Sequence, residues 1–325
     1  MKKHFKKLLL MALMAVMAVG LIACGTDKSD NESIKEEKTS VTITSLDASK
    51  NEIELEVPYN PKRIAILDLA SLDIIDELGV GDRVVGMAST SIDYLEKYSN
   101  DASIKNLGTI KEADLEAVME CEPDIIFIGG RLSKSYDALS EIAPVVYLAT
   151  DTNEGLVNSV SKNAKTIASI FGMEDKVDSL MSDFGVRIDT IKKISSGKTA
   201  LVGMTTSGSF NLLGNDGRCS LIGVEAGFNN LTAAGSTSTH GNESSFETVV
   251  QQNPDYIFVM DRDSAISTAG AKTAKEIVEN ELVKTTDAYK NNHIIYLEHS
   301  NVWYTAEGGI QALDIMLTDL EKGLK

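Results

Sequence analysis

The sequence predicts an α/β protein of two similar lobes, each with a mostly parallel sheet, joined by a single long connecting helix. A length of 325 residues suits two domains of ordinary size. Residues 115–131 (LEAVMECEPDIIFIGGR) and 246–262 (FETVVQQNPDYIFVMDR) align without a gap and share seven of seventeen positions, which indicates an internal repeat. Short apolar runs alternate with helical periodicity on both sides of residues 154–195, a pattern typical of parallel sheets covered by helices.

The first 23 residues have the features of an export signal. Four lysines (Lys2, Lys3, Lys6 and Lys7) precede an apolar run over residues 8–23, which is shorter than the roughly 20 residues that a membrane-spanning helix needs. The run leads into LIAC, which resembles a bacterial lipobox and predicts lipid attachment at Cys24. Residues 24–40 are polar and lack aromatics, so we expect a flexible tether there.

The acidic composition excludes several classes of partner. The 31 Lys and Arg residues stand against 48 Asp and Glu, a formal charge of −17, and removal of residues 1–23 would leave 27 against 48, a charge near −21. Nucleic acid and anionic lipid surfaces repel such a chain. An anionic ligand must therefore be met by a local cluster of arginines.

The first lobe is expected over residues 41–153. The segments that predict strands are RIAIL (63–67), IIFI (125–128) and VVYL (145–148), and those with helical spacing are 71–80, 115–122 and 135–143. A glycine closes the first of these helices and a proline follows the second. The order of the segments predicts strand–helix–strand units.

The connector and the second lobe follow the same reasoning. Residues 154–195 have no strand signal and place apolar residues at helical spacing, so we expect a long helix there. The second lobe is expected over residues 196–325, with strands TALVGM (199–204), YIFVM (256–260) and IIYL (294–297), and helices over 219–228, 246–253 and 274–283.

Three arginines are candidates for binding an anionic ligand. Arg131 and Arg262 each follow a predicted strand, and ligands of open α/β sheets bind outside the carboxyl ends of the strands. Arg218 lies in a glycine-rich turn before a predicted helix, LLGNDGRCSLIG. A guanidinium donates two parallel hydrogen bonds to carboxylate or phenolate oxygens. Solvation of the strand ends is the alternative role, which spacing alone leaves open.

Histidine and aromatic residues follow in loops of the second lobe. His240 lies in the polar loop AAGSTSTHGNESSFE, where it is either a surface residue, a metal ligand or a proton acceptor. His299, Trp303 and Tyr304 come after the strand IIYL, at another carboxyl end. Core packing is the default role of Trp303. Tyr304 suits either a phenolate ligand of a hard cation such as ferric iron, or the wall of a cleft.

Signatures of enzymes are weak. ELGVGDRVVG contains GxG but follows a helix, so it does not meet the context of a dinucleotide-binding turn. P-loop, GxSxG and HExxH motifs do not occur. A catalytic zinc centre would need His240, His293 and His299 together. Cys121 and Cys219 fall in different halves, and we expect small core residues rather than a disulfide.

Four segments carry a resemblance to a known family: EAVMECEPDIIFIGGR, GRCSLIGVEAGFNN, STHGNESSFETVVQQNPDYIFVMDR and IIYLEHSNVWYTAEGG. Together with the export signal, the lipobox-like LIAC, the two lobes and the helical connector, they resemble the solute-binding lipoproteins of ABC transporters. A single long connecting helix is similar to class III, whose members bind iron–siderophore complexes, haem or cobalamin. The segments look like the branch that binds catecholate siderophores, including petrobactin-type ligands.

The resemblance implies roles for particular residues. Arginines matching Arg131, Arg218 and Arg262 face the negative ferric complex in that branch. A histidine and a tyrosine matching His240 and Tyr304 complete the iron coordination when the siderophore supplies only four oxygens, and we expect Trp303 to line the same cleft. The family docks on its permease through a glutamate on each lobe, a role that fits Glu116 and Glu247.

The resemblance also implies what the protein does and where. We expect a monomeric, non-enzymatic binding protein without an intrinsic cofactor, lipid-anchored at the outer face of the cytoplasmic membrane, that delivers a ferric siderophore to an ABC permease. Binding of a hydroxamate siderophore, haem or cobalamin is the alternative within this class. A surface metal-dependent hydrolase that uses His240 and His299 is the alternative of another class.

Overall fold

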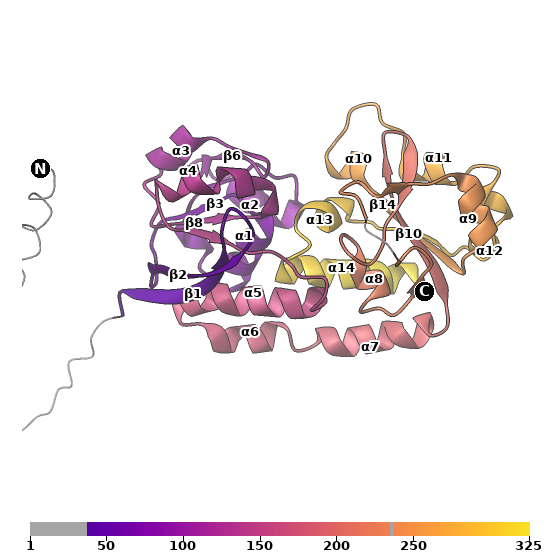
Figure 1. Cartoon of the computed structure of the whole chain (residues 1–325), viewed down its shortest axis with the longest axis horizontal. Coiled ribbons are helices and arrows are strands. Elements are labelled where there is room, and N and C mark those ends of the chain that lie inside the picture. The colour runs from indigo at the N-terminus through magenta and orange to yellow at the C-terminus, as the bar shows by residue number, and fades with distance from the viewer. Residues whose placement is uncertain (1–37, 235–236) are drawn as a thin grey trace, which may run out of the picture. The chain divides into compact units, whose positions relative to one another are not determined.

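The computed structural model describes residues 38–234 and 237–325 (Figure 1). The predicted signal peptide, Cys24 and the tether up to residue 37 lie outside this part of the chain. The first strand, β1, starts at Ser40, next to the predicted start of the first lobe. None of the helices within the described ranges is long and apolar enough to span a membrane.

The N-terminal lobe is built on a five-stranded sheet in the order β5-β4-β3-β8-β9, in which every pair is parallel. Its strands are β3 (Ile64–Ile66), β4 (Val84–Met87), β5 (Lys105–Asn106), β8 (Ile125–Ile128) and β9 (Val145–Tyr147). Its helices are α1 (Leu69–Glu77), α2 (Glu96–Ser99), α3 (Leu115–Glu120) and α4 (Tyr136–Ser140), with short 3₁₀ turns η1 (Gly81–Arg83), η2 (Asp93–Leu95) and η3 (Gly130–Ser135). Two antiparallel hairpins complete it: β1 (Ser40–Leu46) with β2 (Glu52–Pro58), and β6 (Gly108–Thr109) with β7 (Glu112–Ala113).

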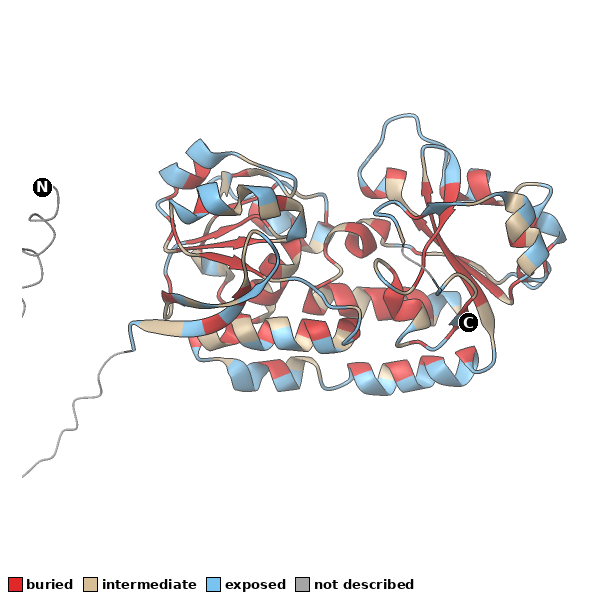
Figure 2. Cartoon of the chain, viewed as in Figure 1, coloured by how far each residue is buried: buried red, intermediate tan, exposed pale blue. Residues whose placement is uncertain are grey.

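Both faces of this sheet are covered, which explains why its central strands β3 and β8 are apolar at every position. Ile64 and Ile66 of β3 pack into one hydrophobic core, and Ala65 between them packs into another. Figure 2 shows the central strands of both sheets as buried. The buried residues Cys121 and Cys219 are free thiols, as the sequence predicts.

The C-terminal lobe contains the sheet β13-β11-β10-β14-β15, with β12 also paired to β10. Its strands are β10 (Thr199–Thr206), β11 (Ser209–Leu212), β12 (Asn229–Asn230), β13 (Asn242–Glu243), β14 (Tyr256–Asp261) and β15 (Ile294–Tyr296). Its helices are α8 (Ser220–Gly223), α9 (Phe246–Gln252), α10 (Arg262–Ala265), α11 (Ala274–Val278), α12 (Asp287–Lys290), α13 (Ser300–Thr305) and α14 (Ile310–Gly323), with the 3₁₀ turn η4 (Val283–Thr285). The central strands are parallel, whereas β11 and β13 are antiparallel.

The connector differs from the single helix that the periodicity predicts. It consists of α5 (Leu156–Phe171), α6 (Glu174–Leu180) and α7 (Phe184–Ser195). Gly172 adopts a left-handed conformation with φ 67° and ends α5. Turn residues 181–183 then separate α6 from α7. Figure 1 shows α6 and α7 running along the two lobes below α5 and α14.

The two copies of the repeat fold alike. Each has a helix whose N-cap side chain bonds a backbone N–H, Asp114 for α3 and Ser245 for α9, followed by a buried strand. The shared aspartate directly precedes that strand and binds the backbone at or before the start of the neighbouring strand. Asp124 accepts hydrogen bonds from the backbone N–H groups of Lys62 and Arg63, and Asp255 accepts one from Thr199. The internal repeat is therefore a repeat of structure.

Two carboxylates cap helices across the lobe boundary. Asp73 of α1 accepts hydrogen bonds from the backbone N–H groups of Gln311 and Ala312 at 2.9 Å each, at the start of α14. Glu225, after α8, accepts one from Val157 at 3.2 Å, at the start of α5. Neither helix has a side-chain cap of its own, since each begins after a glycine. Each lobe thus satisfies a helix end at the boundary with the other.

Candidate functional site

The repeat places two arginines at the carboxyl ends of central strands. Arg131 follows β8 within η3, and Arg262 is the first residue of α10, directly after β14. These are the positions that the sequence predicts. The strand ends of the two lobes lie on either side of α13, which carries Tyr304 (Figure 1).

Three guanidinium groups converge on the ring of Tyr304. The guanidinium carbons of Arg131, Arg218 and Arg262 lie 5.6, 4.5 and 5.6 Å from its centroid. Nη2 of Arg131 donates a hydrogen bond to the carbonyl oxygen of Tyr304 at 2.8 Å, and Nε of Arg262 donates to its hydroxyl at 3.1 Å. A ring face attracts cations. Arginines from both lobes therefore form one positive cluster on a single tyrosine, here called the arginine cluster.

The arginine cluster changes the acidity of Tyr304. Burial alone raises the pKa of its hydroxyl, because Tyr304 is only 4% exposed. The hydrogen bond from Arg262 and the charges of Arg218, Arg262 and Arg131 outweigh burial, so that the pKa lies below its ordinary value. The site therefore makes it easier for Tyr304 to ionise to the phenolate, the form of tyrosine that binds a hard cation.

Neighbouring groups hold the arginines in place. Nη1 of Arg262 donates to Oγ1 of Thr206 at 3.1 Å and to Oδ1 of Asp263 at 3.3 Å. Nη1 of Arg218 donates to the carbonyl of Thr239 at 2.9 Å. Burial, followed by the charge of Arg218, lowers the pKa of Arg131. The cluster is thus pre-organised, with positive charges that repel each other in the absence of an anion.

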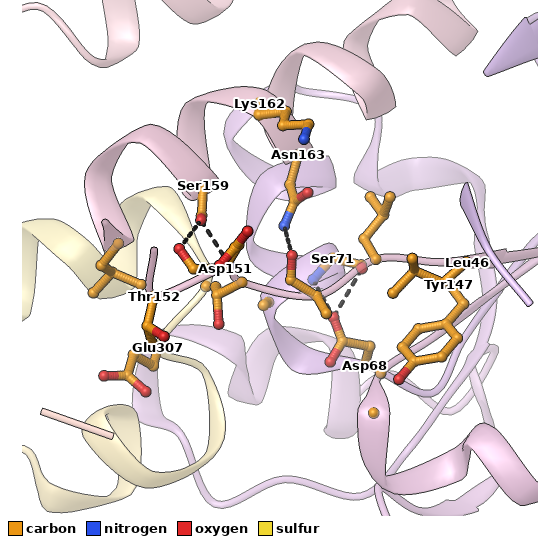
Figure 3. A pocket seen from close by; sticks show the side chains of 18 of the residues that line it. Leu46, Asp68, Ser71, Tyr147, Asp151, Thr152, Ser159, Lys162, Asn163 and Glu307 are labelled. Carbon is orange, nitrogen blue, oxygen red and sulfur yellow. Dashed lines mark hydrogen bonds between the residues drawn. The ribbon is translucent and has the colours of Figure 1, made fainter. Parts of the chain in front are cut away.

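A cavity of about 720 Å³ adjoins the cluster between the lobes. Its wall includes Arg131 from the N-terminal lobe and Arg218 and Tyr304 from the C-terminal lobe, whereas Arg262 is not part of the wall. Figure 3 shows polar groups around it, among them Ser159 and Asn163 of α5. The volume suits a ligand larger than a single amino acid.

The cavity wall also contains two carboxyl groups, Glu307 and Asp68, that the sequence analysis did not identify. Burial, the largest influence, raises the pKa of Glu307 to about 7, against the opposing effects of the Cys219 N–H and of Arg218. Burial likewise raises the pKa of Asp68, which accepts hydrogen bonds from Ser71. Asp68 follows β3, so the strand-end rule that selected Arg131 could have found it. Glu307 has no such signal in a chain rich in acids.

His240 lies on an exposed loop before β13. Burial, and then the charges of Arg262, Arg218 and Lys111, lower the pKa of its imidazole. Lys111 belongs to the turn between β6 and β7 of the N-terminal lobe, so His240 lies within electrostatic range of both lobes. The neutral imidazole that these charges favour is the form that binds metals.

Trp303 requires a correction. It is fully buried, at 0% exposure, and its Nε1 donates to Oδ2 of Asp319 at 2.9 Å. It does not line the cavity, so the structure places it in the core rather than in the cleft wall where it was expected. Consecutive residues of a helix point in different directions, and α13 turns Tyr304 toward the arginines and Trp303 into the core.

The histidines do not form the catalytic centre considered from the sequence. His299 bonds Oδ1 of Asp319 through Nδ1 at 2.8 Å, while His293 bonds the carbonyl of Asp255 at the opposite end of β15. Within the described residues, the group with metal-ligand geometry is Glu298, His299 and Asp319, which lacks His240. Asp319 in that group already accepts hydrogen bonds from Trp303 and from the backbone of His299.

The two candidate docking glutamates occupy equivalent places. Glu116 lies in the first turn of α3 and Glu247 in the first turn of α9, and both side chains are exposed. Leu115 and Met119 beside Glu116 are also exposed, at 39% and 61%. A hydrogen bond from its own backbone and one from Ser245 lower the pKa of Glu247, which is therefore a carboxylate at neutral pH.

Comparison with known proteins finds relatives that match almost the whole chain. The chain is 36% identical over 98% of its length to the petrobactin-binding protein YclQ of Bacillus subtilis, of which the alignment covers 99%. The crystal structure of YclQ superposes with a TM-score of 0.81 over 88% of this chain and 99% of the other. The periplasmic catecholate-siderophore binding protein VctP of Vibrio cholerae is 30% identical, with a TM-score of 0.78 over 87% of this chain and all of the other.

A third structure contains a bound ligand. The siderophore-binding protein BauB, in complex with two molecules of acinetobactin and ferric iron, is 27% identical with a TM-score of 0.76 over 88% of this chain and 99% of the other. The architecture is the class III fold, and the relatives bind substrates rather than transform them. The family model for periplasmic binding proteins matches residues 64–300. The chain belongs to the periplasmic binding protein family.

Proposed function

We propose that the protein captures a ferric siderophore of the catecholate or petrobactin type between its lobes and delivers it to an ABC permease. The observation that carries this proposal is the convergence of Arg131, Arg218 and Arg262 on Tyr304. A ferric tris-catecholate carries about three negative charges, which three guanidiniums offset through charge-assisted hydrogen bonds. The names of YclQ and VctP support the same ligand class.

The charge of the arginine cluster favours a catecholate siderophore over the other ligands that this class of binding protein takes. In a chain with a formal charge of −17, a ligand with little charge would gain nothing from three partly buried guanidiniums in one place. Hydroxamate siderophores, haem and cobalamin carry less negative charge at the metal centre than a tris-catecholate does. The cluster therefore favours the catecholate class over these ligands.

His240 and Tyr304 are proposed to complete the coordination of iron when the siderophore supplies four oxygens. Their neighbours favour the neutral imidazole and the phenolate, the two metal-binding forms. Tyr304 is covered by the arginines, so its hydroxyl must exchange its hydrogen bond from Arg262 for the iron. The iron is cargo that arrives with the siderophore, and we propose no intrinsic cofactor.

Delivery to the permease is proposed to use one glutamate from each lobe. Glu116 and Glu247, exposed on equivalent helices of the two lobes, would dock on the permease as a pair of carboxylates. Lipid attachment at Cys24 would hold the monomeric protein at the outer face of the cytoplasmic membrane. Relatives named siderophore-binding or substrate-binding lipoproteins, such as YfiY and YhfQ of Bacillus subtilis, support this location.

A binding panel tests the proposal. Isothermal titration of the purified protein with ferric petrobactin, a ferric tris-catecholate, a ferric hydroxamate, haem and cobalamin should give saturable binding with the first two. Sub-micromolar dissociation constants, about −8 kcal/mol or better, are expected for those ligands. Preference for a hydroxamate, haem or cobalamin would replace the proposed ligand class, and zinc retention with hydrolytic turnover would favour an enzyme.

A further inference from the structure

The three like charges of the arginine cluster repel one another. Arg131, Arg218 and Arg262 all lie within 5.6 Å of the centroid of one ring, and like charges at such distances repel strongly where water is scarce. Asp263 offsets Arg262 at 3.3 Å, which leaves the charges of Arg131 and Arg218 to be offset until an anion binds. The described carboxyl groups in the cavity wall are Glu52, Asp68, Asp151, Glu154, Asp216 and Glu307.

Most of these carboxyls are committed to other partners. Glu154 lies 3.3 Å and Glu52 3.8 Å from Nζ of Lys162. Asp216 accepts from the backbone of Thr237, and Asp151 from the backbone and side chain of Asn153. Asp68 caps α1 through Ser71, and its charge also acts on Arg131. These hydrogen bonds and ion pairs join the five carboxyls to groups other than the arginines.

Glu307 differs, because its charge interacts with both Arg218 and Arg131. Its Oε1 accepts a hydrogen bond from the backbone N–H of Cys219 at 2.9 Å, and the charges that act on it most strongly are those of Arg218, Glu225 and Arg131. Cys219 follows Arg218 directly and has a left-handed backbone with φ 62°, a conformation that residues other than glycine adopt at a cost. The hydrogen bond from Cys219 therefore helps to fix the loop that carries Arg218.

We propose that Glu307 is the charge-compensating residue of the binding site: its carboxylate offsets Arg131 and Arg218 while the cleft is empty, and it takes up a proton when an anionic ligand binds. The inference rests on the proposed function, since it requires an anionic ligand at the arginine cluster. It makes Glu307 a positioning residue for Arg218 and links ligand affinity to pH.

The charges around Glu307 support proton uptake near neutral pH. Burial raises the pKa of Glu307 to about 7, while Arg218 and Arg131 lower it and Glu225 raises it. The thiol of Cys219 contributes no charge, because burial raises its pKa well above the ordinary value. An anion that pairs with the two arginines removes the charges that favour the carboxylate. The bound state then favours protonated Glu307.

The size of the effect follows from linkage. A group with a pKa of about 7 in the free protein that is protonated in the complex weakens binding about tenfold between about pH 6 and about pH 8. Replacement of Glu307 by Gln keeps an oxygen that accepts from Cys219 and removes the negative charge. Glu307→Gln should therefore bind the anion about tenfold more tightly than the wild type near pH 8 and equally near pH 6.

The experiment measures the affinity of wild-type protein and Glu307→Gln for ferric petrobactin across this range. Protonation of the ligand itself cancels in the ratio of the two affinities. Glu154→Gln is the matched control, because Glu154 lines the same cavity but pairs with Lys162, and its ratio to the wild type should not vary with pH. Titrations of the wild type in two buffers of different ionisation enthalpy give the proton uptake directly, without a variant.

The outcomes are distinct. A pH-dependent ratio for Glu307→Gln, together with uptake of about half a proton near pH 7, supports the inference. Weaker binding of Glu307→Gln at every pH, or no proton uptake by the wild type, overturns it, although the proposed function would stand. Absence of binding to the wild type at every pH would overturn the proposed function and this inference together.

Discussion

The hydroxyl of Tyr304 accepts a hydrogen bond from Nε of Arg262 at 3.1 Å. Arg262 ends the second copy of the internal repeat, and Arg131, which ends the first, donates to the carbonyl oxygen of the same tyrosine. The last residue of each repeat copy therefore donates a hydrogen bond to the same residue, Tyr304 of α13. The repeat therefore has a functional reading: each lobe contributes a cation to a shared surface.

The acidity of Tyr304 tests the arrangement without a ligand. Since the arginines lower the pKa of its hydroxyl, tyrosinate absorption should appear at lower pH in the wild type than in Tyr304→Phe. Ultraviolet difference titration of the two proteins isolates this residue from the other eight tyrosines of the nine in the chain. A difference spectrum that titrates at or above the ordinary value of about 10 would show that the arginines do not outweigh the effect of burial.

His240 should matter only for ligands that leave iron incompletely coordinated. His240→Ala should weaken binding of a ferric bis-catecholate about tenfold or more, because a metal ligand is lost, and leave a ferric tris-catecholate nearly unchanged. The charge-transfer absorption of the bis-catecholate complex should shift as well. Equal effects on both ligands would assign His240 a role in shape or charge rather than in coordination.

The cap that Asp73 forms on α14 predicts a pH-dependent stability. Burial raises the pKa of Asp73 to about 6, against hydrogen bonds from Tyr94, Gln311 and Ala312. Protonated Asp73 therefore stabilises the folded protein. This contribution is full below the pKa of about 4 that Asp73 has in the unfolded chain, and it is lost as the pH rises through about 6, a change of about 3 kcal/mol in the free energy of unfolding. Asp73→Asn does not titrate, so its unfolding free energy should rise relative to the wild type as pH increases.

Urea unfolding of both proteins at a series of pH values measures this difference. Taking the difference removes the titration of the other carboxyls, which the two proteins share. A difference that stays constant between about pH 4 and about pH 7 would show that Asp73 keeps its ordinary pKa in the folded protein.

The docking glutamates should affect transport and not capture. Glu116→Arg with Glu247→Arg should leave the affinity for a ferric siderophore within about twofold of the wild type, since both residues are exposed on α3 and α9. Iron uptake through the permease should be lost, because like charges would meet the basic partner surface. Glu281→Arg, at an exposed site outside both helices, is the control. Undiminished uptake by the double variant would refute the docking role.

The sequence predicts those site residues whose position depends on the local order of strands and helices. The repeat predicted the places of Arg131 and Arg262, because a strand of known period brings its end to the edge of the sheet. It failed for Trp303, since the direction of a ring on a six-residue helix depends on packing with α14 rather than on spacing. It missed Glu307 for a related reason. The bond between Glu307 and Cys219 joins residues 88 positions apart, and no local pattern encodes it.

The connector illustrates a second limit. Apolar spacing over residues 154–195 predicts helix correctly but cannot distinguish one helix from three. Gly172 and the turn at residues 181–183 interrupt the helix without disturbing the apolar periodicity on either side. Likewise, the caps that Asp73 and Glu225 provide come from the opposite lobe, so the sequence around α14 and α5 contains no cap signal.

The affinity of the triple variant Arg131→Ala, Arg218→Ala, Arg262→Ala for a ferric tris-catecholate tests the central claim most directly. Each charge-assisted hydrogen bond contributes about 1.5–3 kcal/mol, so loss of all three should weaken binding by about a thousandfold or more. A control that replaces Lys192, Lys193 and Lys284 by alanine removes the same charge from exposed positions outside the cavity wall. The account predicts wild-type affinity for the control. Affinities of the two triple variants that agree within a few-fold would contradict it.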